Sequence, residues 1–276
     1  MRTAVITVVA GRHDHLRRQE QGLATGTRAP DQRIVVAIDD PGVAAALAGR
    51  PIVVVDHPTS PLGLPLAAAR NAGAARALDG GAELLVFLDV DCIPGPDLVR
   101  RYAEVAARTD RRLLCGPVAY LPPAPDGGYP ATGLDRLAAP HPARPAPADH
   151  ETLDSADHEL FWSLSFAVTA PVWAEIGGFT EAYVGYGGED TDFGQSARAA
   201  GIGLRWVGGA TAFHQHHPVS DPPREHLADI LRNAAIFRRR WGWWPMTGWL
   251  TAFADAGLAR YDPRTDSWAV TGHGMA

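Results

Sequence analysis

Two aspartates, Asp89 and Asp91, follow an apolar run at residues 84–88 that has the length and composition of a buried strand. Alternate residues of an extended segment point to the same side, so we expect the two carboxylates to share a face. Such a pair suits Mn²⁺ or Mg²⁺, which keep part of their coordination shell for substrate phosphates. The simpler alternative is that these acids only cap a helix near Pro94, so the Asp-x-Asp motif alone is weak evidence.

A second acidic cluster lies in the segment Gly-Tyr-Gly-Gly-Glu-Asp-Thr-Asp at residues 185–192. Glycines allow the backbone to approach a ligand, and the acids stand at the start of a predicted helix that runs to about Ala200. A carboxylate near a helix N-terminus can stay ionised and act as a general base on a hydroxyl group. Acids at the start of a helix are also electrostatically favourable without any catalytic role. That explanation accounts poorly for three acids beside glycines.

Three histidines, His214, His216 and His217, follow a short predicted strand at residues 204–207. A neutral imidazole could supply a third metal ligand beside the two carboxylates. A lone histidine is usually not a ligand, but three within four residues favour one. We predict His214, with His216 as the alternative because the two share a face if the segment is extended.

The elements that must position these residues alternate between strand and helix patterns. Strands are predicted at residues 3–9, 33–38, 51–55, 83–88, 113–118, 161–169 and 204–207, and helices at 14–23, 66–78, 97–108 and 171–176. This pattern predicts an α/β fold with a mostly parallel sheet flanked by helices, and ligands at the carboxyl ends of its strands. Residues 121–149 are rich in Pro, Ala, Gly and Asp and read as a long loop.

The C-terminal residues predict helices at 224–241 and 249–258. We therefore expect a catalytic domain at 1–218 and a helical extension at 219–276 packed on it. Trp241, Trp243 and Trp244 are interpreted mainly as core packing, with a homodimer contact or a sugar-stacking surface as alternatives.

Composition narrows the classes of function. Of 276 residues, 46% are hydrophobic and 20% charged, which is typical of a globular protein. All 25 basic residues are arginine, so mechanisms that need a lysine are excluded, and the net charge of −6 argues against a nucleic-acid partner. Cys92 and Cys115 are read as reduced, buried thiols. Without a membrane-length apolar segment, we expect a cytoplasmic protein with no integral membrane association.

Together, residues 87–94 and 177–193 resemble segments of the family 2 glycosyltransferases, within the group whose C-terminal half is galactosyltransferase-like. The resemblance implies a GT-A fold and an inverting, metal-dependent transfer from a nucleotide-sugar donor, with a UDP-sugar favoured. It implies that Asp91 is the principal metal ligand, with Asp89 beside ribose or metal. It also implies that Asp190, assisted by Glu189, is the catalytic base.

The same resemblance assigns further binding residues. Asp39 would read the nucleotide base, and Arg12 and Arg70 would bind the donor. Tyr186, Gly187 and Gly188 would lie on the acceptor side, where Tyr186 stands in place of the usual Trp. The acceptor could be a glycan, a lipid or a small molecule. The alternatives are a nucleotide-sugar-binding protein of the same fold without activity and a metal-dependent phosphatase, which the missing lysine disfavours.

Overall fold

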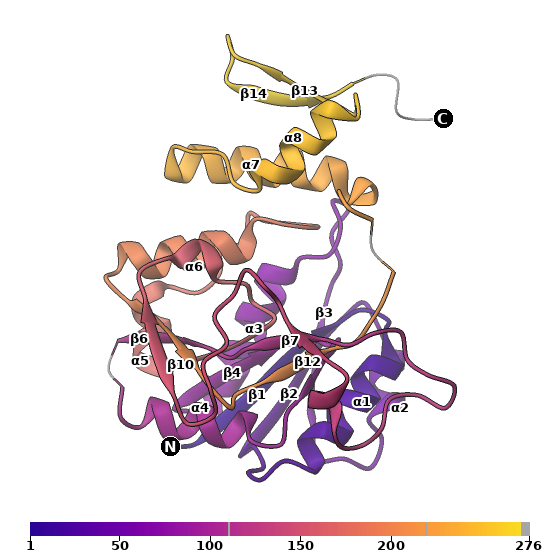
Figure 1. Ribbon diagram of the computed structural model, residues 1–276, viewed down its shortest axis with the longest axis vertical. Helices are drawn as coiled ribbons and strands as arrows, with labels where there is room; N and C mark the ends of the chain where they lie inside the picture. Colours follow the sequence, from indigo (N-terminus) through magenta and orange to yellow (C-terminus); the bar gives the residue numbers. More distant parts are fainter. Residues whose placement is uncertain (110, 219, 272–276) are drawn as a thin grey trace.

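A computed structural model describes residues 1–109, 111–218 and 220–271, and its centre is an eight-stranded sheet (Figure 1). The strand order is β3-β2-β1-β4-β10-β6-β11-β9. In this order the strands are β3 (Val53–His57), β2 (Gln32–Ile38), β1 (Thr3–Val9), β4 (Leu84–Leu88), β10 (Ser165–Thr169), β6 (Arg112–Cys115), β11 (Gly203–Val207) and β9 (Thr152–Ser155). Pairings among the first four are parallel, whereas β10 and β9 run antiparallel to their neighbours. The predicted α/β fold with a mostly parallel sheet is therefore confirmed.

Helices cover both faces of this sheet, because alternate strand residues point to opposite sides. On one face Ile6 and Phe87 pack with residues of α3 (Leu66–Asp79), α5 (Ala170–Ile176) and α6 (Glu189–Ala199). On the other face Val5 and Val86 pack with residues of α1 (His13–Ala24) and α4 (Leu98–Ala106). Helix α3 lies close to the sheet because Gly73 has no side chain: a Cβ there would come within 2.6 Å of Ile6. A short helix, α2 (Gly42–Ala46), and two 3-10 turns, η1 (Leu134–Arg136) and η2 (His158–Leu160), complete this part; η1 lies within the predicted loop at 121–149.

A smaller sheet, in the order β5-β12-β7-β8, lies beside the large one and was not predicted. It consists of β5 (Cys92–Pro94), β12 (Ala212–His214), β7 (Val118–Tyr120) and β8 (Ala139–Pro140). The single strand predicted at 113–118 is wrong, because the chain passes from β6 in one sheet to β7 in the other. The change occurs at Gly116, where a Cβ would lie only 2.0 Å from the carbonyl oxygen of Ala210.

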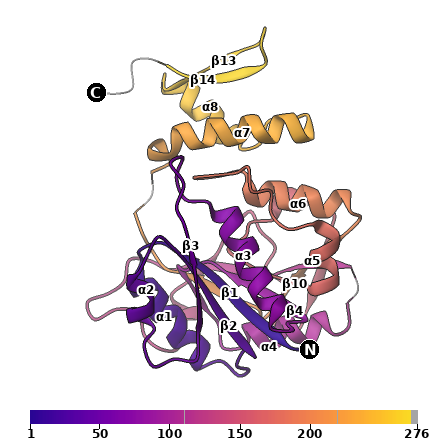
Figure 2. The same cartoon turned by 180° about the vertical axis from the view of Figure 1, so that it is seen from behind.

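The C-terminal residues form a unit with its own apolar core, stacked on the α6 side of the large sheet (Figure 2). It contains η3 (Arg224–His226), α7 (Leu227–Trp241), α8 (Thr247–Asp255) and a hairpin of β13 (Ala259–Asp262) and β14 (Ser267–Val270). The predicted extension is therefore not purely helical. The turn residues between two aromatic-containing segments were the sequence signal of the hairpin, and this signal was missed. Residues 219 and 272–276 of that predicted extension lie outside the described residues, and the division into two domains stays a prediction.

Within the described residues, no helix combines the length and the apolar composition needed to cross a membrane.

Candidate active site

The carboxyl ends of β1 and β4 carry the first site residues. These strands are parallel neighbours, so the segments that follow them lie side by side. Arg12 follows β1 in the left-handed conformation, with φ of 51°, and its Nη1 lies 2.5 Å from Oδ2 of Asp91, which follows β4. Arg12, predicted to lie beside the donor, therefore contacts the predicted metal ligand.

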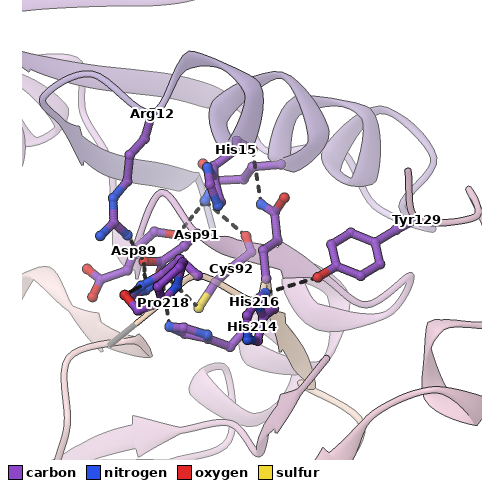
Figure 3. A network of polar contacts seen from close by, with 12 residues as sticks. Arg12, His15, Asp89, Asp91, Cys92, Tyr129, His214, His216 and Pro218 are labelled. Atoms are coloured by element: carbon purple, nitrogen blue, oxygen red, sulfur yellow. Dashed lines mark hydrogen bonds and ion pairs between the residues drawn. The ribbon is translucent and has the colours of Figure 1, made fainter. Parts of the chain in front are cut away.

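Asp91 is also the centre of a potential metal site (Figure 3). Nε2 of His214 lies 3.7 Å from its Oδ1, and Nε2 of His217 lies 3.4 Å from its Oδ2. One ligand atom from each of these three residues lies within 4.8 Å of the others. Strand β12 places His214 directly opposite Cys92, the residue after Asp91. The structure thus brings the predicted pair Asp91 and His214 together.

His216, the alternative ligand, is not brought into this group. Its side chain is exposed, and its backbone N–H donates to Oη of Tyr129 at 3.0 Å. His217 approaches Asp91 instead. The two-residue alternation used to predict His216 does not apply, because β12 ends at His214 and the N–H of Gln215 turns back to the carbonyl oxygen of Asp91 at 2.7 Å.

The protonation states suit a metal site. Burial alone would raise the pKa of Asp91, but the hydrogen bond from His217 and the electrostatic interactions with His214 and Arg12 lower it. Burial also lowers the pKa of the His214 imidazole. Both groups are thereby favoured in the ionisation state that binds a cation, the carboxylate and the neutral imidazole.

A buried arginine joins the two acidic clusters. Nη2 of Arg70 lies 3.1 Å from Oδ1 of Asp89, and its Nη1 lies 3.2 Å from Oε1 of Glu189, 119 residues away in the sequence. Burial disfavours the charged guanidinium, but the charges of Asp89 and Glu189 outweigh this and raise its pKa. Arg70 therefore stays charged and holds the end of β4 against the start of α6.

The acids at the start of α6 have different surroundings. Burial, together with the charge of Asp190, raises the pKa of Glu189 to about 7, although Arg70 opposes this. Burial also raises the pKa of Asp190, while a hydrogen bond from the backbone N–H of Thr191, at 2.7 Å, acts in the opposite direction. Glu189 forms an ion pair with Arg70, whereas the partly exposed Asp190 has no ion pair among the described residues.

Asp192, the third acid of this segment, faces the interior. It is fully buried, and its carboxylate accepts hydrogen bonds from four side chains at 2.7 to 3.1 Å: Thr180, Tyr183, Arg240 and Trp241. The last two belong to α7, so this carboxylate attaches the start of α6 to the C-terminal unit. Its role is structural.

The glycine loop before α6 is held in place by α7. Nδ2 of the buried Asn233 donates to the carbonyl oxygens of Val184, Tyr186 and Gly187, at 3.1, 3.2 and 2.8 Å. Gly187 and Gly188 both have positive φ, near 90°. The predicted acceptor residue Tyr186 is 39% exposed and stacks on His226, with ring centroids 4.4 Å apart. Sequence reasoning missed Asn233, although a polar residue among the apolar positions of α7 was a usable signal.

We expect Asn233→Ala to lower the free energy of unfolding by about 1–3 kcal/mol, because three carbonyl groups lose their donor. Denaturant unfolding measures this change. Arg239→Ala, at an exposed position of the same helix, is the matched control and should change stability by less than about 0.5 kcal/mol. Equal stabilities of the two variants would show that Asn233 does not support the loop.

Asp39, a further predicted donor residue, is exposed at the end of β2, and its φ of 49° lies in the left-handed region. The neighbouring Asp40 is engaged instead: its carboxylate accepts from the N–H of Gly11 at 2.7 Å and lies 2.9 Å from Nε2 of His13. Desolvation would raise the pKa of Asp40, but these two hydrogen bonds lower it. A role for Asp39 in reading the base stays a prediction.

Comparisons with known proteins concern the fold and one segment of the sequence. Residues 156–218 match the family described as the N-terminal domain of galactosyltransferase. A search of curated protein sequences finds no match. Among solved structures, S. aureus TarS residues 1–349 share 13% identity over 85% of this chain and 65% of that one, with a TM-score of 0.55. GalNAc-T7, crystallised with UDP, GalNAc and Mn²⁺, shares 15% identity over 83% of this chain and 48% of that one, with a TM-score of 0.56.

The chain spans less than two thirds of the length of either structure, and at these identities the likeness concerns the fold. The matched family segment contains α6 as well as His214, at the end of β12, and His217. The chain therefore has a GT-A type fold, as these two structures do, and its residues 156–218 are similar to the N-terminal domain of galactosyltransferase.

Proposed function

We propose that the protein is an inverting, metal-dependent glycosyltransferase of family 2 that moves a sugar from a nucleotide-sugar donor, with a UDP-sugar favoured, to an acceptor hydroxyl. One observation carries this proposal: Arg70 joins Asp89, beside the Asp91–His214–His217 group, to the acids of α6. These contacts support a single site in which the Asp91 end would bind the donor and the α6 end would remove a proton.

The chemistry of the three residues fits a divalent cation. A carboxylate and two imidazoles suit a first-row ion such as Mn²⁺, whereas Mg²⁺ prefers oxygen ligands. In this proposal Asp91, His214 and His217 hold the ion. When bound, the cation would offset the negative charge that develops on the leaving nucleoside diphosphate.

Asp190 is the proposed base. Glu189 is fixed by its ion pair with Arg70, whereas Asp190 keeps a partly exposed carboxylate at the N-terminus of α6. Its oxygen would accept the proton of the acceptor hydroxyl as that hydroxyl attacks the anomeric carbon from the face opposite the leaving group. The raised pKa improves Asp190 as a base, because catalysis is most efficient when the pKa approaches the working pH.

Thermal-shift measurements test the donor and the metal together. UDP at about 100 times its Kd should raise Tm by roughly 5–10 °C in the presence of Mn²⁺. The shift should disappear with EDTA and in Asp91→Asn, while GDP and CDP test the choice of nucleotide. A UDP shift that survives exhaustive chelation would remove the proposed role of Asp91.

The pH dependence of the rate provides a further test. A base whose pKa is raised above the ordinary Asp value of about 3.9 is protonated, and inactive, over a wider acidic range. We therefore expect kcat to fall tenfold per pH unit below a midpoint that lies above the ordinary Asp pKa. A pH–rate profile at saturating donor and Mn²⁺ measures this midpoint. A rate that stays constant down to pH 4 would contradict the assignment of Asp190 as the base.

A further inference from the structure

A cavity of about 280 Å³ lies in the C-terminal unit, between α8 and the hairpin of β13 and β14. The hairpin lies on the side of α8 that faces away from the large sheet (Figures 1 and 2). Three aromatic rings, two hydroxyl groups and one leucine line the cavity, from Trp244, Tyr261, Trp268, Thr247, Thr251 and Leu250. This cavity is separate from the candidate active site, and the proposed reaction makes no use of it.

Two of the aromatic rings are held in place by one carboxylate. Oδ1 of Asp266 accepts from Oη of Tyr261 at 2.6 Å and from Nε1 of Trp244 at 3.0 Å. Its Oδ2 accepts from Nε of Arg238 at 2.8 Å, which also balances its charge. The N–H of Trp244 and the O–H of Tyr261 are therefore already paired and are not free donors to a ligand. Rings that are already ordered lose little conformational freedom when a ligand binds.

The hydroxyl groups add a polar side to the cavity. Thr247 and Thr251 are four residues apart on α8, so they lie on the same face, and both are exposed. Each hydroxyl can donate one hydrogen bond and accept others. Among the described residues that line the cavity, none is charged, so the lining offers no ion pair to an anionic or cationic ligand.

The size of the cavity limits its occupant. Sites for drug-sized ligands occupy roughly 300–1,000 Å³, so about 280 Å³ is suited to a group of one ring. A pyranose has apolar C–H faces and a rim of hydroxyl groups, which matches a lining of ring surfaces and threonine hydroxyls. An alkyl chain would match the rings but not the hydroxyls.

We infer that this cavity binds one neutral hexopyranose residue of a glycan, with its C–H face on Tyr261 and its hydroxyls toward Thr247 and Thr251. This goes beyond the proposed transfer reaction, because the sugar is bound without being changed. A second point of attachment would raise the effective concentration of a glycan near the enzyme without any new contact at the active site.

Saturation-transfer NMR on the full chain, without donor or metal, tests the inference. The probes are methyl β-galactopyranoside and methyl β-glucopyranoside, and octan-1-ol represents an alkyl ligand. We expect at least one glycoside to bind with a millimolar Kd, and Tyr261→Ala to weaken it about tenfold, which corresponds to about 1.4 kcal/mol. Thr251→Val, at an exposed position of α8, should weaken it by a smaller factor and serves if Tyr261→Ala disturbs the hairpin.

Val270→Ala is the matched control, because Val270 lies on β14, is 47% exposed and does not line the cavity. It should bind the glycoside as the unchanged protein does. The inference is overturned if neither glycoside shows saturation transfer, if only octan-1-ol binds, or if Tyr261→Ala and Thr251→Val both retain full affinity. Because no donor or turnover is involved, these outcomes are independent of the proposed transferase activity.

Discussion

Asp190→Asn is expected to lower kcat by a factor of about 10²–10⁴, because the acceptor hydroxyl loses the group that removes its proton. The amide is close to the carboxylate in size, so the start of α6 should keep its structure. Steady-state kinetics with donor and acceptor at saturation measure the effect. The Mn²⁺-dependent thermal shift with UDP should be retained, since Asp190 is not among the residues assigned to the cation.

Asp255→Asn controls for the loss of one negative charge, because Asp255 is an exposed acid at the end of α8. Its kcat should match that of the unchanged protein. If Asp190→Asn turns over at the full rate, Asp190 is not the base. If the unchanged protein binds UDP but transfers no sugar to any acceptor tested, a nucleotide-sugar-binding protein without activity becomes the better interpretation.

Asp192→Ala is expected to have the largest effect on stability, a loss of about 2–5 kcal/mol. The substitution removes the acceptor of four side chains, and buried donors such as Oη of Tyr183 would remain without a partner. Urea unfolding measures the change in the free energy of unfolding. Because Arg240 and Trp241 lose their contact with α6, we also expect faster proteolysis near the C-terminal unit.

Asp14→Ala is the matched comparison, since Asp14 is also an acid in the first turn of a helix. Its partner Arg17 lies on the surface, so its removal should lower stability by less than about 1 kcal/mol. Similar losses in the two variants would show that Asp192 contributes only helix-start electrostatics. In that case the attachment of α7 to α6 depends on other contacts.

The sequence by itself determined those features that depend on neighbouring residues. The run of five apolar residues in β4 predicted a buried strand, and its parallel neighbour β1 was equally clear. Asp89, Asp91 and the start of α6 at Glu189 followed from these local patterns. Parallel strands bring their carboxyl ends to one edge, so even the location of the site could be predicted before its geometry was known.

Only the tertiary structure decided which side chains of each cluster meet. His217 rather than His216 approaches Asp91, because the chain turns at Gln215. Asp192 looked equivalent to Asp190 in sequence, yet two of its four partners come from α7, nearly 50 residues later. The physical reason is that periodicity reports the face on which a residue lies, whereas its partner depends on packing between distant segments. The Asp89 and Asp91 motif after β4 could be recognised in the sequence. Only the fold shows that Arg12, His214 and His217 surround Asp91.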